Sequence, residues 1–516
     1  MIPSSRRRFF QDVGRGMLVA SVGYGVAVDW GFSPAWAEEE PGELNFGSLE
    51  PLVVLMQETP ADRLQPRLVE MLKSGTSLHE LVSAAALANA RSFGGEDYVG
   101  FHTLMALGPA YSMASLLPAA QQPLPVLKVL YRNGSRLQEV GGRANELHAV
   151  SPAALASDTS PAEQLERAVR SRDRGQSERI LAAISQSSPD EAYNALLHAV
   201  DDGTEVHRVV LAHRSWDMLS IVGMEHATTM LRQSLRYCVK HEDSAVKHNT
   251  ELRELLPKLL DQYSLANKAA GTRQADDAWV DQFSQTLFAA TPAQAADAVA
   301  AALAEGMLPE HVGEALALTA NQLVLRDAGR TARQVQANKP EGSVHGDSVG
   351  VHSSDTIHAW RGIARTSNPR NAAAALVLAG YQVARDRNNG GNFLEWQPRP
   401  HSKQLERIAA QDGETILKEL DGAIREQNQE YACALVHRYG EQGYPERPAF
   451  DLLLKYAVSE DGQLHAEKYY KTTSDEFAAL RPAFRWRELV ALARVTASEF
   501  GRPAPGVAEA RGLLGV

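Results

Sequence analysis

The sequence of 516 residues contains only two cysteines, Cys238 and Cys433. Two thiols cannot build a disulfide framework, and there is no Cys-x-x-Cys pair to hold zinc or an iron–sulfur cluster. A P-loop and the His-Glu-x-x-His motif of zinc proteases are also missing. Any metal that this chain binds is therefore expected on histidine and carboxylate side chains.

Aromatic residues and positive charge are scarce as well. Phe, Trp and Tyr make up 7% of the residues, the net charge is −11, and the only Lys/Arg-rich stretch is at the N-terminus. Nucleic acid is therefore not an expected partner. Beyond the N-terminus no apolar run approaches the roughly 20 residues that a membrane-spanning helix needs.

The N-terminal residues 1–37 have the pattern of an export signal. The stretch SRRRFFQ (5–11) fits the twin-arginine motif, an apolar stretch follows at 17–28, and Ala-Trp-Ala (35–37) precedes three glutamates as a cleavage site. The apolar stretch is too short for a stable anchor. We expect export by the twin-arginine machinery, cleavage after Ala37, a periplasmic or other extracytoplasmic location, and no stable membrane insertion afterwards.

The pattern Asp-x-Val-Gly-x-His occurs twice, as DYVGFH (97–102) and DSVGVH (347–352). Other segments recur in the same order: QLER at 164–167 and 404–407, EAYNALLH (191–198) as EYACALVH (430–437), and GMEHA (223–227) as GQLHA (462–466). Ordered recurrence with a slowly changing offset indicates an internal duplication.

The apolar residues of both copies recur with helical i, i+3, i+4 spacing, as in LHELVSAAALANA (78–90), and Pro and Gly cluster between such runs. We predict an all-α protein with two homologous tandem halves related by a pseudo-two-fold axis. The predicted divisions are a signal peptide (1–37), a first half (45–265), a linker (266–284), a second half (285–500) and a C-terminal tail (501–516).

Three pairs of histidines recur in recognisable surroundings: His102/His352, His198/His437 and His226/His465. In Asp-x-Val-Gly-x-His the aspartate is placed to cap a helix, and the glycine allows close approach of a neighbour. Histidines on helices are commonly structural, so recurrence is the main ground for a functional role. The full set of metal ligands and orienting carboxylates that we predict is His102, His198, His352, His437, Asp97, Asp347, Asp202 and Glu441.

Residues present in one half only are candidates for specialised roles. His213 and His358 are the predicted proton-transfer groups, because imidazole titrates near neutral pH. The predicted cofactor-binding residues are Asp355, which occurs in the second half only, and the recurring pair His226/His465. A set of histidines and carboxylates without useful thiols suits iron, manganese, zinc or copper, and a haem held between two histidines is an alternative.

The segments GDSVGVHSSDTIHAWRGIAR (346–365) and HRVVLAHRSWDMLSIVGMEHATTMLRQSLRYCV (207–239) resemble the questin oxidase-like family, helical proteins related to a fungal Baeyer–Villiger-type oxygenase. Asp347, His352, His207 and the Glu225–His226 pair match that family's pattern, whereas Ser348 and Val351 depart from it. The resemblance covers 60–100 residues in pieces. It implies an all-α fold and oxygen or redox chemistry.

These observations support three hypotheses of different class. The first is an exported metal- or haem-dependent oxidoreductase that acts on a small organic molecule. The second is a non-catalytic helical-repeat protein of the cell envelope whose concave surface binds a partner. The third is a hydrolase that uses metal-bound water.

Overall fold

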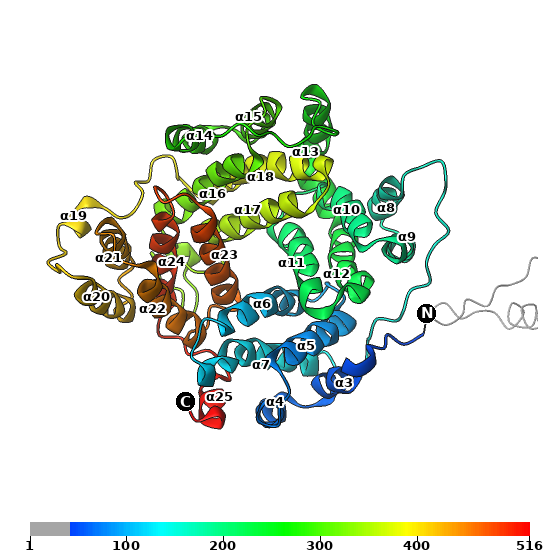
Figure 1. Ribbon diagram of the computed structural model, residues 1–516, viewed down its shortest axis with the longest axis horizontal. Helices are drawn as coiled ribbons and strands as arrows, with labels where there is room; N and C mark the ends of the chain where they lie inside the picture. Colours follow the sequence, from blue (N-terminus) through cyan, green and yellow to red (C-terminus); the bar gives the residue numbers. More distant parts are fainter. Residues whose placement is uncertain (1–41) are drawn as a thin grey trace, which may run out of the picture. The chain divides into compact units, whose positions relative to one another are not determined.

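A computed structural model describes residues 42–516 of the chain. These residues form 23 α-helices, with isolated bridges in place of β-strands (Figure 1). The prediction of an all-α fold is confirmed. The twin-arginine segment and its cleavage site lie outside the described residues. None of the helices within residues 42–516 is both long and apolar enough to cross a bilayer.

The chain divides into two compact units by its contacts. The described residues of the smaller unit are 42–44 and His148–Ser151, where Glu43 and His148 pair as an antiparallel bridge. The larger unit, Asn45–Leu147 and Pro152–Val516, contains all the helices described below.

Helices of the first half begin at good capping residues. Ser77 forms a capping box with Glu80, and Pro occupies the first positions of several helices. Gly94, in the left-handed region, ends one of them. The helices are α3 (Glu50–Glu58), α4 (Ala61–Lys73), α5 (Leu78–Phe93), α6 (Tyr98–Ala114), α7 (Pro123–Glu139), α8 (Pro161–Arg170), α9 (Arg174–Ser187), α10 (Pro189–Val200), α11 (Val206–Val222), α12 (Ala227–Lys240) and α13 (Glu242–Gln262).

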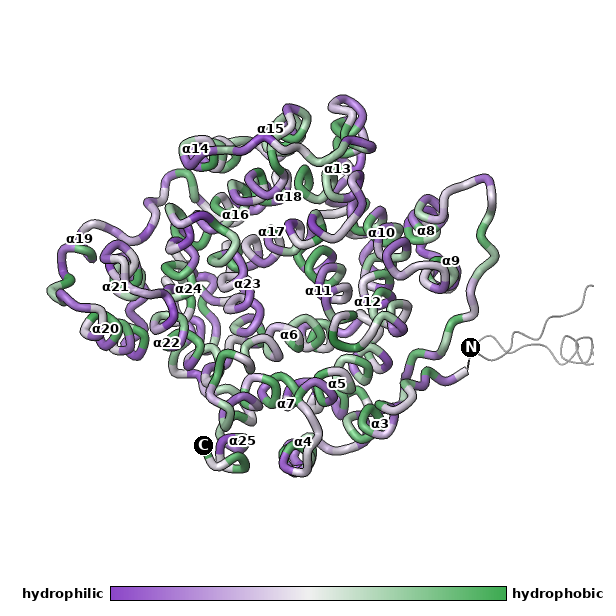
Figure 2. Tube along the Cα trace, viewed as in Figure 1, coloured by the Kyte–Doolittle hydropathy of each residue, from purple (hydrophilic) through white to green (hydrophobic). Residues whose placement is uncertain are grey.

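The second half follows the same rules, with Thr291 and Asn368 as caps before helices that start with Pro. Its helices are α14 (Asp277–Ala289), α15 (Pro292–Ala304), α16 (Pro309–Arg326), α17 (Val349–Thr366), α18 (Pro369–Gly390), α19 (Ser402–Leu405), α20 (Gly413–Arg425), α21 (Gln429–Glu441), α22 (Glu446–Ser459), α23 (His465–Ala479), α24 (Trp486–Glu499) and α25 (Val507–Leu514). Hydrophobic and hydrophilic residues alternate along most of these helices, as amphipathic packing requires (Figure 2).

Four helices form an inner ring in the larger unit. Helix α6 packs on α11, α11 on α17, α17 on α23, and α23 on α6, so the circuit is closed. The other helices surround these four in Figure 1. Two members of the ring come from each half of the sequence, and the ring is therefore assembled from both halves.

The packing pattern of the first half recurs in the second. Helices α5, α6 and α7 contact one another as α16, α17 and α18 do, and α3 packs on α5 and α7 as α14 packs on α16 and α18. The last helix of each half packs on the other half. Helix α13 of the first half packs on α15 and α18, and α25 of the second half packs on α4 and α7. This pattern supports the duplication, and the superposition of the halves stays a prediction.

The packing of each last helix on the other half changes two of the predicted divisions. The C-terminal tail (501–516) contains α25, which is packed on the first half, and the linker (266–284) already contains the start of α14. Helix α22 lies between α21 and α23, whereas α10 is followed directly by α11. Because α11 and α23 occupy equivalent places in the inner ring, His465 corresponds in position to His207 and not to His226. The repeat-based pairing missed this register because it did not allow for an additional helix.

Candidate metal centre

Each helix of the inner ring carries a histidine at or near its first turn. These residues are His102 of α6, His207 of α11, His352 of α17 and His465 of α23. We call them the four-histidine cluster. Neighbouring rings lie close together all the way round, with centroid separations of 4.8, 6.0, 5.3 and 5.4 Å. The cluster is therefore built from both halves of the chain.

The histidines of the cluster form two pairs that face each other through Nε2. The Nε2 atoms of His102 and His207 are 3.2 Å apart, and those of His352 and His465 are also 3.2 Å apart. As the side chains lie, residues 42–516 contain no group of three or more His, Cys, Asp or Glu side chains arranged to hold a metal ion. The arrangement is thus two pairs in contact through their rings.

The Nδ1 atoms of three rings have acceptors as partners. His102 Nδ1 lies 2.7 Å from the carbonyl oxygen of Tyr98, and His207 Nδ1 lies 2.6 Å from Glu205 Oε1. His465 Nδ1 lies 3.3 Å from the carbonyl oxygen of Gly462. Carbonyl and carboxylate oxygens only accept hydrogen bonds, so each Nδ1 carries the proton. The Nε2 atoms of these rings are left with lone pairs.

The first pair then needs a cation between its two rings. Neutral His102 and His207, both protonated on Nδ1, would direct two lone pairs at each other across 3.2 Å. Only a proton on one Nε2 or a bound metal ion turns this contact into an attraction. A carboxylate or carbonyl that fixes Nδ1–H and leaves Nε2 free is the usual support of a metal-bound histidine.

The surroundings favour the neutral form of the cluster. Burial lowers the pKa of His102 to about 2 and that of His352 to about 3, and it also lowers the pKa of His465. The positive charge of buried Lys468, on α23, acts in the same direction on all three. Neutral imidazole is the form that binds metal ions.

Glu205 is fixed in its ionised form beside the cluster. Although burial raises its pKa, hydrogen bonds from His207 and from the Tyr237 hydroxyl lower it to about 2. The same carboxylate caps α11 by accepting from the backbone N–H of Arg208. Glu205 therefore links the start of α11 to the orientation of His207.

Aromatic side chains cover one side of the cluster. The ring of Tyr98 lies 4.4 Å from that of His102, and Phe101 stacks on His102 at 4.9 Å. Tyr98 is 62% exposed, so this side of the cluster is close to solvent.

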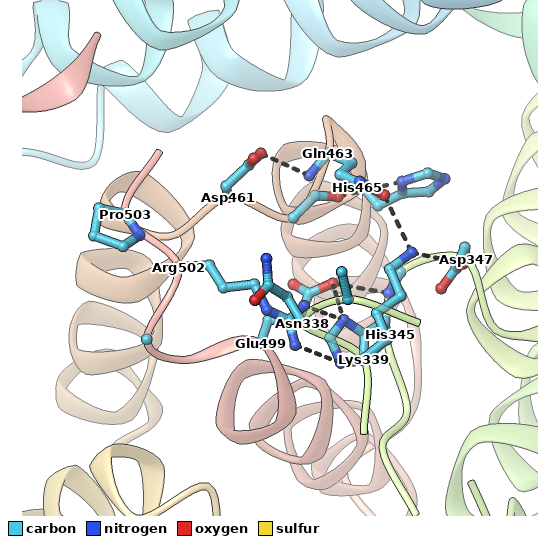
Figure 3. A pocket seen from close by; sticks show the side chains of 14 residues that line it. Asn338, Lys339, His345, Asp347, Asp461, Gln463, His465, Glu499, Arg502 and Pro503 are labelled. Carbon is cyan, nitrogen blue, oxygen red and sulfur yellow. Dashed lines mark hydrogen bonds and ion pairs between the residues drawn. The ribbon is translucent and has the colours of Figure 1, made fainter. Parts of the chain in front are cut away.

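A polar pocket of about 330 Å³ adjoins the cluster at His465 (Figure 3). Lys339 donates to Asp347 at 2.7 Å and to Gln463 at 3.1 Å, and Arg502 donates to His345 at 2.7 Å. Glu499 accepts from the backbone N–H of Gly346 at 2.9 Å, and burial raises its pKa to about 7. The pocket is suited to a small polar molecule and has in Glu499 a group that exchanges protons near neutral pH.

The glycines of the two Asp-x-Val-Gly-x-His motifs allow the close approach that the sequence predicts. A Cβ on Gly100 would lie 2.5 Å from the ring of Phe93, and one on Gly350 would lie 2.6 Å from the backbone nitrogen of Val324. In both cases the neighbour belongs to the preceding helix, α5 or α16.

The two motif aspartates do not have the same role. Asp97 caps α6 by accepting from the N–H of Gly100 at 2.7 Å, and it pairs with Arg136. Asp347 is not a cap, because Ser348 holds that position on α17, and its carboxylate pairs with Arg330 and Lys339. Neither carboxylate contacts a histidine of the cluster by any hydrogen bond or ion pair, so both support the backbone around it.

Ser348 also stands in a Gly-x-Ser-x-Gly spacing, residues 346–350, the pattern of a hydrolase nucleophile. That motif requires a strand before the serine, and residues 42–516 have none there. The hydroxyl of Ser348 instead accepts from the N–H of Val351 as a helix cap.

A second group of buried charges lies further along the inner helices. The rings of His213 and His358 are 5.8 Å apart. His358 contacts Glu476 at 2.8 Å and Asp475 at 3.4 Å, and His213 contacts Asp217 at 3.3 Å. Burial lowers the pKa of both histidines. The two predicted proton-transfer residues are thus brought together, about two helical turns from the cluster. Asp355 is buried on the same helix as His358.

The structure does not bring the remaining predicted ligands to the cluster. His198 and Asp202 belong to α10 and the turn after it, where Asp202 pairs with Arg170 and Arg253. His437 and Glu441 pair with each other on α21, half-exposed. His226 packs edge-on against Phe46. The recurrence of these residues therefore does not bring them into one site.

Three residues of the site were missed by the predictions from sequence. His207 stood out only through the family resemblance. Glu205, two residues before it, and Lys468, three residues after His465, had no motif to mark them. The carboxylate close to a histidine at the start of a predicted helix was the available signal for Glu205.

Comparisons with protein-family models, with curated proteins and with solved structures find no match for this chain. The function is therefore argued from the geometry of the site.

Proposed function

We propose that the four-histidine cluster binds a redox-active transition metal and that the chain is an exported metal-dependent oxidoreductase. The main support is the contact of His102 with His207, in which both Nδ1 atoms have acceptors and both Nε2 atoms face each other at 3.2 Å. Two imidazoles that bind one ion at about 2.0–2.1 Å with a tetrahedral angle have their nitrogens roughly 3.3 Å apart. Both pairs have this spacing.

The proposal needs a small closing movement of the rings. As they lie, the two pairs do not share one ion, and rotation of the side chains would have to bring a third or fourth Nε2 toward it. The centroid separations of 4.8–6.0 Å are near the roughly 5 Å expected for imidazoles around a single tetrahedral ion.

The ligand set favours a metal ion over a haem. Two axial histidines on opposite faces of a haem would have Nε2 atoms roughly 4 Å apart with the macrocycle between them. Imidazole ligands suit copper, iron and zinc. Four histidines would close the tetrahedral shell of zinc, whereas copper and iron accept further ligands, which favours redox chemistry over hydrolysis.

The resemblance to questin oxidase-like proteins points in the same direction. Two of its matched residues, His207 and His352, belong to the cluster. The substrate in this proposal is a small polar organic molecule in the pocket beside His465, with Glu499 as the proton donor or acceptor.

Metal analysis tests the proposal directly. Protein taken from the extracytoplasmic fraction, and protein reconstituted with Cu(II), Fe(II), Mn(II) or Zn(II), should contain about one redox metal per chain. His102→Ala and His352→Ala should lose the metal with little change in melting temperature. His437→Ala, a half-exposed histidine away from the cluster, should keep it. If the wild-type protein stays metal-free after reconstitution, the cation between His102 and His207 is a proton, and the metal proposal is wrong.

The export part of the proposal rests on residues 5–37. Replacing Arg6 and Arg7 by lysine should keep the chain in the cytoplasm with its N-terminus uncleaved. Cell fractionation and N-terminal sequencing of the exported form, expected to begin at Glu38, provide the check.

A further inference from the structure

A pocket of about 1070 Å³ lies along the C-terminal parts of α6 and α11. Apolar side chains of both helices line it, among them Met105, Trp216 and Met218. It also reaches Lys471 of α23. On α11 its lining begins two turns beyond His207, and on α6 it begins two residues beyond His102. It shares no lining residue with the polar pocket at His465.

Arg214 lines this pocket and is almost without partners. The residue is buried, with 7% of its surface exposed. Within residues 42–516 its side chain makes one ion pair or hydrogen bond, a long contact of 3.4 Å from Nη1 to Asp217 Oδ2, and its Nε has no hydrogen-bond partner there. A guanidinium carries five N–H donors. Most of the donors of this buried cation are therefore unused.

Arg236, another buried arginine of the chain, is fully paired. Arg236 donates to Glu178, to Glu96 and to the carbonyl oxygen of Gly94 at 2.6–3.1 Å. A buried charge is strongly destabilising unless it is paired and hydrogen-bonded. Arg214 lacks this pairing and, unlike Arg236, lines a large pocket.

The other charged groups near the pocket do not satisfy the hydrogen-bond donors of Arg214. Lys471 is a second cation of the lining, and its own partner is Asp475 at 2.5 Å. Asp217 is 44% exposed. Asp355 makes no hydrogen bond or ion pair with Arg214. Burial raises its pKa, and the nearby charge of Arg214 opposes that rise only in part. The unmet requirement at this pocket is for an anion.

The apolar part of the pocket is suited to a flat molecule. Trp216 is held in place by parallel stacking on Tyr193, with centroids 4.4 Å apart and planes at 11°, so it offers a fixed planar wall. Met105 and Met218 are flexible and polarisable side chains that adapt to aromatic surfaces. The volume is sufficient for a drug-sized ligand.

We propose that this pocket binds an aromatic organic anion, with its carboxylate on Arg214 and its ring against Trp216 and the methionines. Arg214 is the residue that determines the specificity for negative charge. The site is independent of the metal centre, because none of the four histidines lines it.

Calorimetric titration with three probes of equal ring size tests the charge preference. The probes are 1-naphthoate, 1-naphthalenemethanol and 1-naphthylmethylamine. Wild-type protein should bind the naphthoate at least about tenfold more tightly than the alcohol, and the amine most weakly. Arg214→Met should remove the preference while keeping affinity for the alcohol. Arg67→Met, which changes an exposed arginine of α4, should behave as wild type.

Two further readouts separate the outcomes. Arg214→Met should raise the melting temperature, because an unpaired buried charge is replaced by an apolar side chain. The His102→Ala protein should bind naphthoate as the wild type does. The proposal for the anion pocket can therefore hold even if the metal proposal fails. Equal affinity of the wild type for naphthoate and the alcohol, no binding of any probe, or a preference that persists in Arg214→Met would each overturn the proposal.

Discussion

His102 and His207 face each other through Nε2 at 3.2 Å although the Nδ1 atom of each ring already has an acceptor. His102 uses the carbonyl of Tyr98 in its own helix, and His207 uses the carboxylate of Glu205. Both Nδ1 protons are thus donated to acceptors close in sequence, and each Nε2 atom carries a lone pair that points at the other ring. The protonation states that the surrounding acceptors impose are the reason why this contact calls for a cation.

Glu205→Gln should weaken metal binding without unfolding the protein. Glutamine can still cap α11 and still accepts from His207, but it no longer stabilises positive charge on that ring. Loss of such a supporting carboxylate typically lowers metal affinity by about 10–100-fold. Competition with a chelator measures the change, and circular dichroism checks the fold. An unchanged affinity would mean that His207 is not a ligand.

Glu499 should make the stability depend on pH between about 4.5 and 7. Burial raises its pKa from an ordinary 4.5 to about 7. In this range the folded protein keeps a proton that the unfolded chain releases, so the stability from this group is complete below pH 4.5 and is lost as the pH rises through 7. The shift corresponds to about 3 kcal/mol as an upper estimate.

Glu499→Gln should therefore stabilise the protein at pH 7.5 relative to the wild type and change little at pH 4.5. Denaturant unfolding at the two pH values gives the comparison. Glu139→Gln, at a carboxylate that is 61% exposed, is the matched control and should show no such difference. The same loss of stability with pH in Glu499→Gln as in the wild type would contradict the assignment.

The two copies of Asp-x-Val-Gly-x-His should respond differently to the same substitution. Asp97 is the cap of α6, so Asp97→Ala should cost about 1 kcal/mol and Asp97→Asn should recover most of it. In the second copy the cap is Ser348, so Ser348→Ala should cost a similar amount. Thermal unfolding provides the measurement. If Asp97→Asn is as unstable as Asp97→Ala, the ion pair with Arg136 and not the cap is the stabilising contact.

The all-α fold could be predicted from the sequence, and so could three members of the cluster: His102 and His352 as metal ligands and His465 as a cofactor-binding residue. Helical periodicity indicated the fold class, and the repeated motif singled out His102 and His352. Recurrence alone could not separate them from His198 and His437, because residues that hold a helix pair together recur as faithfully as ligands do. Only the placement of α10 and α21 outside the inner ring distinguishes the two sets.

The remaining site residues depend on tertiary contacts that a single sequence does not carry. His465 was assigned a wrong counterpart because α22 shifts the register between the halves. The relevant property of Arg214 is its lack of partners, which becomes apparent only when the surrounding helices are in place. The local pattern predicted the Asp97 cap correctly, because a cap involves residues a few positions apart, but at the second motif the cap is Ser348 and not Asp347.

The last prediction concerns a buried ion pair that joins the two halves. Lys128 of α7 lies 2.7 Å from Glu467 of α23 and donates to the carbonyl oxygens of Ala457 and Glu460, also at 2.7 Å. Both charged side chains are almost fully buried. Lys128→Met would leave the carboxylate of Glu467 buried without its cation, and we expect a cost of about 3–5 kcal/mol.

The double variant Lys128→Met/Glu467→Leu removes both charges and should recover most of this loss, since a well-packed apolar pair of similar volume is often neutral. Chemical unfolding of the two single variants and the double variant gives the coupling energy. Arg447→Met, at an exposed ion pair with Asp451, should cost less than about 1 kcal/mol and serves as the control. If the double variant is as unstable as Lys128→Met alone, then the loss comes from the two backbone carbonyls that Lys128 satisfies, and these contacts rather than the ion pair hold α7 to the second half.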